Sequence, residues 1–258
     1  MEIAKKAFQN NIAYRVDYFA GVINTLVMIF VNIAIWRAIY ESDDTLNGVQ
    51  LKVVTTYIAL AFLMQCIFAM EDYFIEGKVT SGMISSDLLK PLSFRGYVLS
   101  YNIGSTFFKL IMQLTPTLIV LVIIFNLLPP FSLAMGLIFI ASTVLGYLVL
   151  YCLNFIVWVS SFWFYYTFSL VTIKDAFVMV LSGALIPLWF LPQGLFDFVK
   201  LTPFESIFFT PISIYLGQVP SGEIITAIIK QVAWILLLAA IGHILWKAAK
   251  RKLVLQGG

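Results

Sequence analysis

The sequence offers few side chains whose types and spacing could perform catalysis. The chain has one histidine, His243, so neither a Ser-His-Asp triad nor a histidine-based metal site can be assembled with any specificity. The GxxxxGK[ST] loop that cradles nucleotide phosphates is absent. Cys66 and Cys152 lie inside apolar runs, which is typical of buried thiols rather than of a disulfide or metal site. We therefore expect no enzyme activity, no metal and no cofactor in this chain.

Charged side chains inside the apolar runs would matter for ion-coupled transport. A proton or sodium site near the middle of a membrane usually needs a carboxylate or a histidine there. The acidic residues of this chain lie instead near the ends of the apolar runs or between them. Lys109 comes nearest to an intramembrane charge, and its long side chain can extend to the inner interface; a substrate contact is the alternative. The energy for any transport is thus expected from outside this chain.

The composition of the 258-residue chain indicates a membrane protein. Hydrophobic residues make up 61% and charged residues 11%, against about 45–50% and about 25% in soluble proteins. A core surrounded by water cannot bury this much apolar surface, so the solvent must be lipid. The net charge is +3, and no long run of Lys and Arg indicates nucleic-acid binding. We expect an all-α polytopic fold with one transmembrane domain, residues 1–258.

Six apolar stretches are long enough to cross a bilayer, which takes about 20 residues. They are Tyr18–Tyr40, Leu51–Met70, a stretch within Tyr97–Leu128, Phe131 to beyond Leu153, Val171–Phe190 and Ile224–Leu245. Residues 2–16 carry apolar side chains every four positions, which predicts a short amphipathic helix on the membrane surface. A frayed terminus is the alternative for these residues.

The distribution of Lys and Arg predicts the orientation, because cytoplasmic loops carry an excess of both. With six spans and a cytoplasmic N-terminus, the inner side holds Lys5, Lys6, Arg15, Lys78, Lys90, Arg95, Lys174, Lys247, Lys250, Arg251 and Lys252. The outer side then holds only Arg37, Lys52 and Lys200. This excess predicts that both termini are cytoplasmic.

A polar segment, Glu76–Gly96, joins the second and third spans on that cytoplasmic side. Thr80 and Ser81 are suitable N-cap types, and Pro91 disfavours helical geometry in the residue before it. A short helix is therefore predicted over Thr80–Leu89. Several apolar side chains of this segment need a cover, which a partner protein or the lipid surface could provide: Met83, Leu88, Leu89 and Leu92.

An outer segment, residues 191–222, joins the fifth and sixth spans. Prolines in and just before it prevent one continuous helix, because proline cannot donate a backbone hydrogen bond; the four that interrupt this region most closely are Pro187, Pro192, Pro203 and Pro211. Irregular backbone at membrane depth must be covered by protein or face water. The segment is either an outer gate that closes a translocation path or an irregular outer loop.

Two stretches carry a resemblance to a known family. The sequences "GKVTSGMISSDLLKPLSF", after the second span, and "SGALIPLWFLPQGLFDFVKLTPFESIFFTPISIYLGQ", after the fifth, resemble the membrane subunits of type-2 ATP-binding-cassette exporters. The resemblance covers nearly the whole chain and rests on pattern and placement. It implies six spans with both termini cytoplasmic, an interfacial helix over residues 2–16, and a pair of re-entrant outer helices over about Leu191–Leu216, which favours the gate.

The resemblance also implies a coupling helix that docks on a separate ATPase subunit. On this chain the helix matches about Thr80–Leu89, and the residues expected at the contact are Thr80, Gly82, Met83, Ser86, Asp87, Leu88, Leu89, Lys90 and Pro91. The acidic-Gly-Thr pattern that usually precedes it is present only loosely, as Glu76-Gly77 with Thr80 displaced. ATP and Mg²⁺ would be bound by the partner ATPase.

The same resemblance implies a permease subunit of an exporter in a bacterial cytoplasmic membrane. A second permease, identical or homologous, would complete the path, because one six-span chain encloses little. Polar side chains of the first two spans are expected to line that path: Asn24, Asn32, Thr55 and Thr56. An ion-coupled secondary carrier and a membrane scaffold without transport are the alternative functions.

Overall fold

The computed structural model describes residues 15–41, 45–46, 48–89 and 93–254. Five helical stretches among these residues are long and apolar enough to cross a membrane: Phe19–Tyr40, Leu51–Phe68, Phe94–Phe125, Leu133–Phe162 and Ile224–Lys252. They support the predicted all-α polytopic membrane protein. The interfacial helix predicted for residues 2–16 lies outside the described residues, apart from the first residues of α2.

The elements follow one another along the chain with short connections. Their order is α2 (Arg15–Tyr40), β1 (Thr45–Leu46), β2 (Val49–Gln50), α3 (Leu51–Phe68), α4 (Phe74–Thr80), α5 (Ile84–Leu88), α6 (Phe94–Lys109), η1 (Leu110–Leu114), α7 (Thr115–Phe125), α8 (Leu133–Val159), η2 (Ser160–Phe162), α9 (Phe168–Leu181), η3 (Leu188–Phe190), α10 (Gln193–Lys200), η4 (Phe204–Ser206), α11 (Phe209–Tyr215) and α12 (Ile224–Val254). The strands β1 and β2 form a small antiparallel hairpin between α2 and α3.

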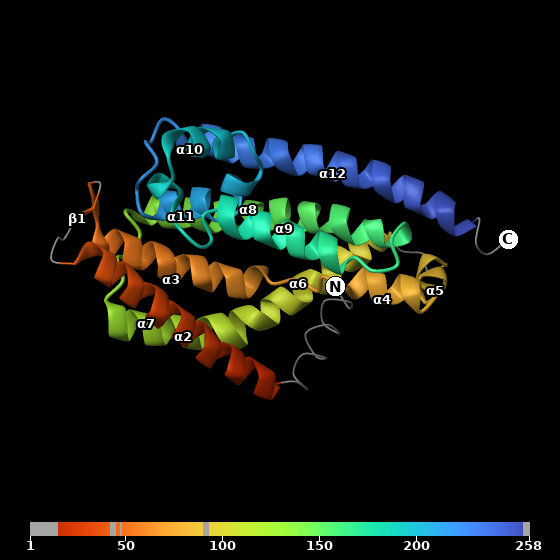
Figure 1. Ribbon diagram of the computed structural model, residues 1–258, viewed down its shortest axis with the longest axis horizontal. Coiled ribbons are helices and arrows are strands. Elements are labelled where there is room, and N and C mark those ends of the chain that lie inside the picture. The colour runs from red at the N-terminus through yellow and green to blue at the C-terminus, as the bar shows by residue number, and fades with distance from the viewer. Residues whose placement is uncertain (1–14, 42–44, 47, 90–92, 255–258) are drawn as a thin grey trace.

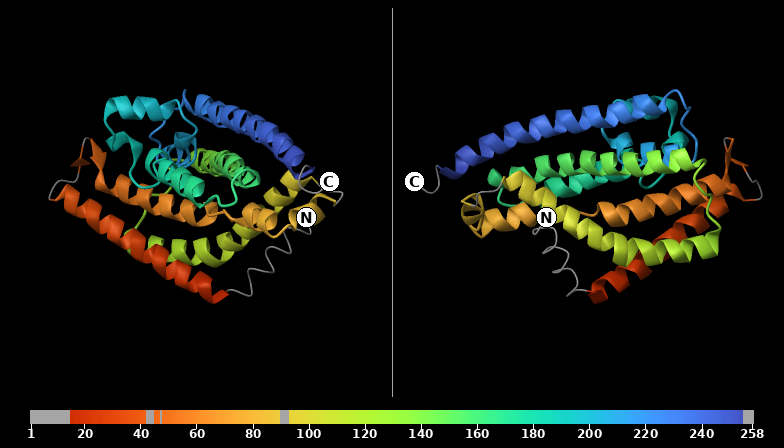
Figure 2. Two further views of the ribbon diagram at one scale, coloured as in Figure 1. Left: turned by 45° about the vertical axis from the view of Figure 1, so that its right-hand side comes forward. Right: turned by 180° about the vertical axis from the view of Figure 1, so that it is seen from behind.

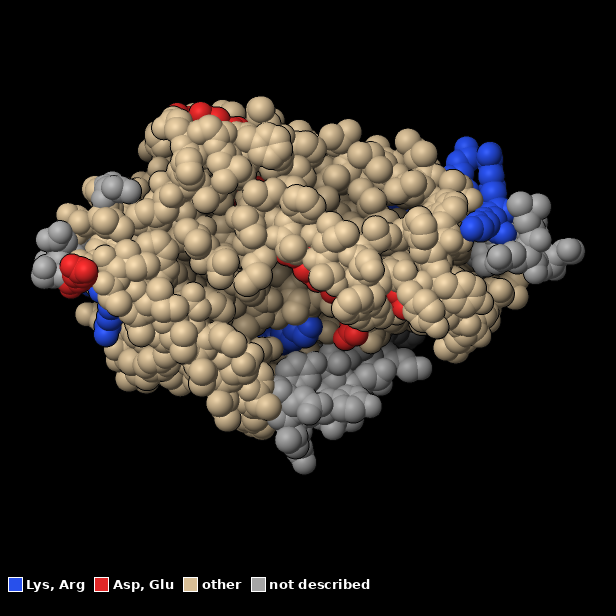
Figure 3. Space-filling view, viewed as in Figure 1, with Lys and Arg blue, Asp and Glu red and all other residues tan. Residues whose placement is uncertain are grey.

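The long helices run roughly along the longest axis of the molecule (Figure 1). Helix α12 packs along α8, and α2 packs against α3 and α7. The short helices α4 and α5 lie at the end where α12 finishes, whereas α10, α11 and the hairpin lie toward the other end, and the views of Figure 2 keep this separation. Most of the face in Figure 3 is neither acidic nor basic, and a group of Lys and Arg side chains lies where α12 ends.

The third apolar stretch is one continuous helical path that changes register in its middle. Between α6 and α7, η1 is a turn of π-helix. Pro116 has no N–H to donate to the preceding turn, and the hydroxyl of Thr115 donates instead to the carbonyl of Leu110 at 2.8 Å. At the end of α6, Lys109 Nζ donates to the carbonyl of Ala69 at 2.7 Å, just beyond the end of α3. Its side chain thus extends toward the end of α3, and its extension to the inner interface stays a prediction.

The fifth apolar stretch differs from the prediction. A continuous helix over Val171–Phe190 is wrong beyond Leu181, where α9 ends. Gly183 follows in the left-handed conformation, with φ of +81°, which ends helices and favours glycine. An added Cβ at Gly183 would also collide with the hydroxyl of Tyr57 and lie 3.1 Å from Phe209 Cβ. With 14 residues, α9 is about 21 Å long.

Neighbouring elements donate hydrogen bonds to the backbone carbonyls that follow the end of α9. The Tyr57 hydroxyl of α3 donates to the carbonyl of Gly183 at 2.8 Å, and Gln65 Nε2 of α3 donates to the carbonyl of Ala184 at 3.1 Å. The backbone N–H of Phe209, at the start of α11, donates to the carbonyl of Ser182 at 3.0 Å. Three consecutive carbonyls are therefore bonded to α3 and α11, which ties this turn into the core.

Candidate functional site

The polar segment forms two short helices rather than the single predicted one. Thr80 is the last residue of α4 and not an N-cap, because its hydroxyl donates back to the carbonyl of Glu76 at 2.9 Å. Gly82 then adopts a left-handed φ of +73° and turns the chain. The second helix, α5, begins at Ile84 and ends at Leu88, before Pro91 as predicted. The helix boundary is thus set by the glycine rather than by the hydroxyl side chains.

An ion pair joins the two short helices. Lys78 Nζ of α4 contacts Asp87 Oδ2 of α5, and both side chains are largely buried. The ammonium group also lies over the ring of Phe74, 4.9 Å from its centre, and over that of Tyr97 at 5.2 Å. Removal of one partner would leave the other charge poorly solvated. The pair therefore holds the hairpin of α4 and α5 in one shape.

A carboxylate of α4 connects the polar segment to the start of α9. Glu76 Oε2 accepts hydrogen bonds from the backbone N–H of Thr167 at 2.8 Å and from its hydroxyl at 2.5 Å. Thr167 is fully buried and is the N-cap of α9. The carboxylate thereby satisfies a backbone donor at a helix N-terminus, where negative charge is stabilised.

A second carboxylate connects the end of α3 to α8 and α9. Asp72 Oδ1 accepts from Trp158 Nε1 at 3.0 Å and from Lys174 Nζ at 3.1 Å. Lys174 Nζ also contacts Asn154 Oδ1 at 2.8 Å and Asp175 Oδ1 at 2.7 Å. Trp158 is buried and the Lys174 side chain is only 9% exposed. Sequence reasoning missed this network, and its only signal was that Asp72 and Lys174 fall near the ends of apolar stretches.

The predicted contact residues of the polar segment divide into exposed and buried ones. Met83 is 57% exposed and Leu89 is 86% exposed. Thr80, Gly82 and Ser86 are exposed as well. Asp87 is buried, as a partner of Lys78, and Leu88 is half-buried. Lys90 and Pro91 lie outside the described residues.

The carboxylate of Asp87 contacts Lys78 within the polar segment. Whether Asp87 and Leu88 also contact an ATPase stays a prediction. Met83, just before α5, and Leu89, just after it, expose apolar surface. We call these two side chains the tip of the polar segment.

The four prolines of the outer region lie at or near the starts of short helices. Pro187, Pro192 and Pro203 are the N-caps of η3, α10 and η4, and Pro211 lies in the first turn of α11. The first N–H groups of a helix have no partner within it, so proline costs little there. The prolines thus divide the outer segment into two short α-helices and one turn of 3₁₀-helix, with a further 3₁₀ turn, η3, just before it.

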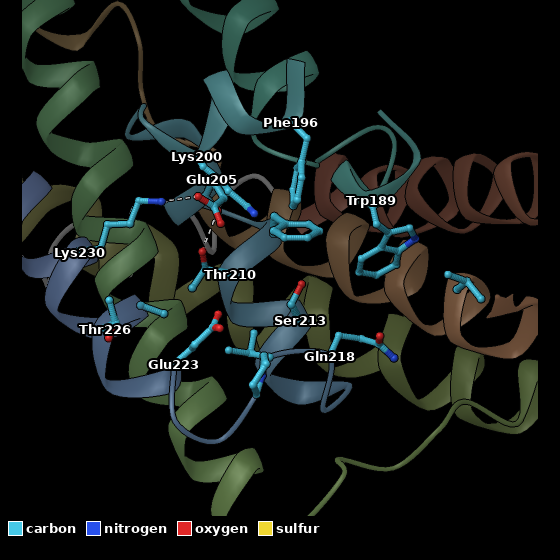
Figure 4. A pocket seen from close by; sticks show the side chains of 15 residues that line it. Trp189, Phe196, Lys200, Glu205, Thr210, Ser213, Gln218, Glu223, Thr226 and Lys230 are labelled. Carbon is cyan, nitrogen blue, oxygen red and sulfur yellow. Dashed lines mark hydrogen bonds and ion pairs between the residues drawn. The ribbon is translucent and has the colours of Figure 1, made fainter. Parts of the chain in front are cut away.

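A pocket of about 480 Å³ lies between the outer segment and the start of α12 (Figure 4). Lys230 Nζ extends toward Glu205 and pairs with its Oε2 at 2.5 Å, and Thr210 Oγ1 donates to the Glu205 carbonyl at 3.2 Å. Lys200 Nζ lies 4.2 Å from the centre of the Phe196 ring. Glu205 thereby neutralises a lysine that the sequence places within the last span, a pairing that sequence reasoning did not predict.

The four predicted path residues do not gather on one surface of this chain. Asn24 is exposed and Asn32 is half-buried on α2, where Asn32 Nδ2 donates to the carbonyl of Met28 at 2.9 Å. Thr55 and Thr56 are buried in α3. Whether these side chains line a path between two chains stays a prediction.

One comparison with known proteins identifies the family. A family model described as ABC-2 family transporter protein matches residues 26–257. No match was found among curated proteins. The matched region includes all five long helices almost completely, the polar segment and the outer segment. Because the match spans nearly the whole chain, this protein belongs to the ABC-2 family of transporter proteins, as a membrane subunit of a type-2 ATP-binding-cassette transporter.

Proposed function

We propose that this permease subunit exports its substrate with energy from a separate ATPase subunit, which binds ATP and Mg²⁺. One observation carries the proposal: the polar segment is braced internally by Lys78 and Asp87 while its tip exposes Met83 and Leu89. A braced segment that presents apolar side chains suits a protein partner, since exposed apolar groups without lipid or protein cover are costly. The lipid surface is the alternative cover.

The contacts of the polar segment suggest how motion of the ATPase would reach the membrane. Glu76 holds the start of α9 through Thr167, and Asp72 holds α8 and α9 through Trp158 and Lys174. A push on α4 and α5 would therefore move α8 and α9 with them. The closure of two ATPase subunits on ATP is the motion that would supply this push.

The proposed topology has six spans, with α9 as the fifth, and places both termini in the cytoplasm of a bacterium. The basic residues of the described chain support this orientation, because α4, which carries Lys78, and the end of α12, which carries several lysines, lie toward one end of the molecule, and Lys174 contacts Asp72 just before α4. Arg37, Lys52 and Lys200 lie on α2, α3 and α10, toward the other end. The outer segment would then form the gate on the outer side. A second permease, identical or homologous, would complete the path.

The test is the association of the purified permease with an ATP-binding-cassette ATPase encoded beside it. We expect Met83→Glu and Leu89→Glu to weaken this association, each by roughly tenfold to a hundredfold, because burial of a side chain of this size is worth about 1.5–3 kcal/mol. Leu201→Glu is the matched control, since Leu201 is 78% exposed at the other end of the molecule.

Three results would count against the proposal. Unchanged association in both polar-segment variants would exclude the tip as the docking surface. Transport that continues without ATP while an ion gradient remains would indicate a secondary carrier. A permease that never co-purifies with an ATPase in mild detergent would indicate a scaffold.

A further inference from the structure

A second pocket, of about 600 Å³, lies where the end of the polar segment, which includes the start of α6, meets α8 and α12. Three basic side chains line it, Arg95, His243 and Lys250, beside three aromatic ones, Phe94, Tyr151 and Trp246. No lining residue carries a carboxylate. Among the described residues, none of the three basic groups forms an ion pair with a carboxylate. We call this cavity the basic pocket.

The basic pocket is held in shape by its own residues. Arg95 Nη2 donates to the carbonyl of Ala239 at 3.4 Å, and its guanidinium lies 5.2 Å from the centre of the Phe155 ring. Phe94 stacks on Trp246, with ring centres 4.9 Å apart and an angle of 11° between the planes. The Tyr151 hydroxyl donates to the Arg95 carbonyl at 3.2 Å. The positive charge of Arg95 is thus fixed in place before any ligand arrives.

The contact between Arg95 and His243 favours an anion as the ligand. Arg95 Nη1 lies 3.3 Å from His243 Nδ1. Since arginine can only donate, Nδ1 must accept, and the proton of the neutral imidazole is then on Nε2. His243 therefore offers a donor on its other nitrogen, beside the permanent charge of Arg95 and the ammonium group of Lys250. The N-terminus of α6 adds a partial positive charge at the same place.

Apolar surface continues from the basic pocket toward the middle of the membrane. Leu99 of α6 lines the pocket, and Ile103 and Phe107 lie one and two turns beyond it on the same helix. Ile103 is 47% exposed and Phe107 is 58% exposed. On α12, Leu236 lies about two turns from His243, away from Lys250, and is 66% exposed, and Ile244, beside His243, is 67% exposed. A ligand with a charged head and long apolar chains would match both parts of this surface, whereas an acidic protein surface would match only the pocket.

We propose that the basic pocket binds the phosphate headgroup of an anionic phospholipid. Basic pockets between membrane helices on the cytoplasmic side are typical sites for such headgroups, and Trp and Tyr side chains are frequent at this depth. The pocket faces the cytoplasmic leaflet in the orientation proposed above, but binding does not require coupling to an ATPase. The lipid would join α6, which follows the polar segment, to the last span.

The experiment measures the thermal stability of the purified full chain in a neutral detergent with added lipid. We expect phosphatidylglycerol to raise the melting temperature in a saturable way, while phosphatidylcholine and inorganic phosphate at equal concentration do not. Lys250→Gln should weaken the apparent affinity for phosphatidylglycerol roughly fivefold, and Lys250→Gln combined with His243→Gln by more than tenfold. Lys247→Gln is the control, because Lys247 is exposed on the same helix outside the lining.

Each contrary result has a definite meaning. An equal response to phosphatidylcholine, or an unchanged response of the double variant, would overturn the proposal. Stabilisation by inorganic phosphate equal to that by the lipid would identify a free anion as the ligand instead. If the double variant binds phosphatidylglycerol normally but loses an ATPase partner, the pocket is a protein-docking surface and the lipid assignment is wrong.

Discussion

Two carboxylates four positions apart, Asp72 and Glu76, connect the polar segment to α8 and α9. Each accepts two hydrogen bonds from groups that are distant in sequence. Bonds to a charged acceptor contribute about 1.5–3 kcal/mol each, roughly twice as much as bonds between neutral groups. These two residues therefore decide how firmly the polar segment is attached.

The first prediction concerns Glu76→Ala. This change removes Oε2, which accepts both hydrogen bonds from Thr167, and leaves a fully buried N–H and hydroxyl without their partner. We expect the free energy of unfolding to fall by about 2–3 kcal/mol, because an unsatisfied buried donor carries its full desolvation cost. Thermal unfolding in detergent checks this. Glu71→Ala is the control, since Glu71 is exposed, and equal melting temperatures for the two variants would contradict the role of Glu76.

Little of this residue-level network could be predicted from the sequence. The chain shows that Asp72, Glu76 and Lys174 lie near the ends of apolar stretches, and no more. The contacts of Glu76 with Thr167 and of Asp72 with Lys174 depend on how segments about 90 to 100 residues apart pack together. Asp87 illustrates the limit, because its place in a polar loop indicates exposure whereas the fold turns it toward Lys78.

At the scale of elements, α8 and the outer segment approach each other closely. A Cβ added at Gly146 would lie 2.6 Å from the carbonyl oxygen of Ile207 and 3.0 Å from that of Ser206. The same Ser206 carbonyl accepts from Gln231 Nε2 of α12 at 2.8 Å, and Gln231 is completely buried. Glycine in α8 thus allows α8, α12 and the outer segment to meet.

The second prediction follows from this approach. Gly146→Ala should destabilise the chain by about 1–3 kcal/mol, because the atoms that the methyl group would meet belong to the backbone and cannot rotate away. Gly136→Ala in the same helix is the matched control, since its Cβ would meet only Pro130 at 3.4 Å. That variant should be neutral or slightly more stable, as alanine favours helix. Denaturation in detergent compares the two, and similar stability would refute the steric argument.

The elements themselves were largely predictable, with two informative exceptions. Long apolar stretches define α2, α3, α6 to α7, α8 and α12, because only helices of that length satisfy their backbone in lipid. The fifth stretch is also largely apolar, but Gly183 and the hydrogen bond from Tyr57 end α9 early. The short helix of the polar segment begins later than Thr80 suggests, because the hydroxyl bonds backward along α4. In both cases a hydrogen bond that forms in the fold sets the helix boundary at a different residue from the one that the sequence pattern predicts.

At the scale of the whole molecule, the polar segment and the outer segment lie toward opposite ends of the helices (Figures 1 and 2). The proposed mechanism needs this separation, because force would enter at one face of the membrane and the gate would respond at the other. Helix α9 begins at the Glu76 contact, and the chain that follows it leads directly into the outer segment.

The third prediction is the sidedness of these two regions. Ser81 and Gln193 are exposed, on the polar segment and on α10, and each can be replaced by cysteine. In intact cells a membrane-impermeant maleimide should label Gln193→Cys, whereas Ser81→Cys should react only after permeabilisation. The unsubstituted chain corrects for the native Cys66 and Cys152. The reverse labelling pattern would invert the proposed orientation.

The bonded turn after α9 also bears on how the chain is made. The carbonyls of Ser182, Gly183 and Ala184 receive their hydrogen bonds from α11 and α3. Since α9 covers about 21 Å of a hydrocarbon layer about 30 Å thick, in the proposed topology this turn lies at a depth where water cannot replace those donors. When the chain has been synthesised only as far as α9, the donor to the Ser182 carbonyl does not yet exist, because it belongs to α11. Until α11 emerges, the carbonyl of Ser182 therefore lacks the donor that it has in the folded chain, so the start of α11 completes the turn that follows α9.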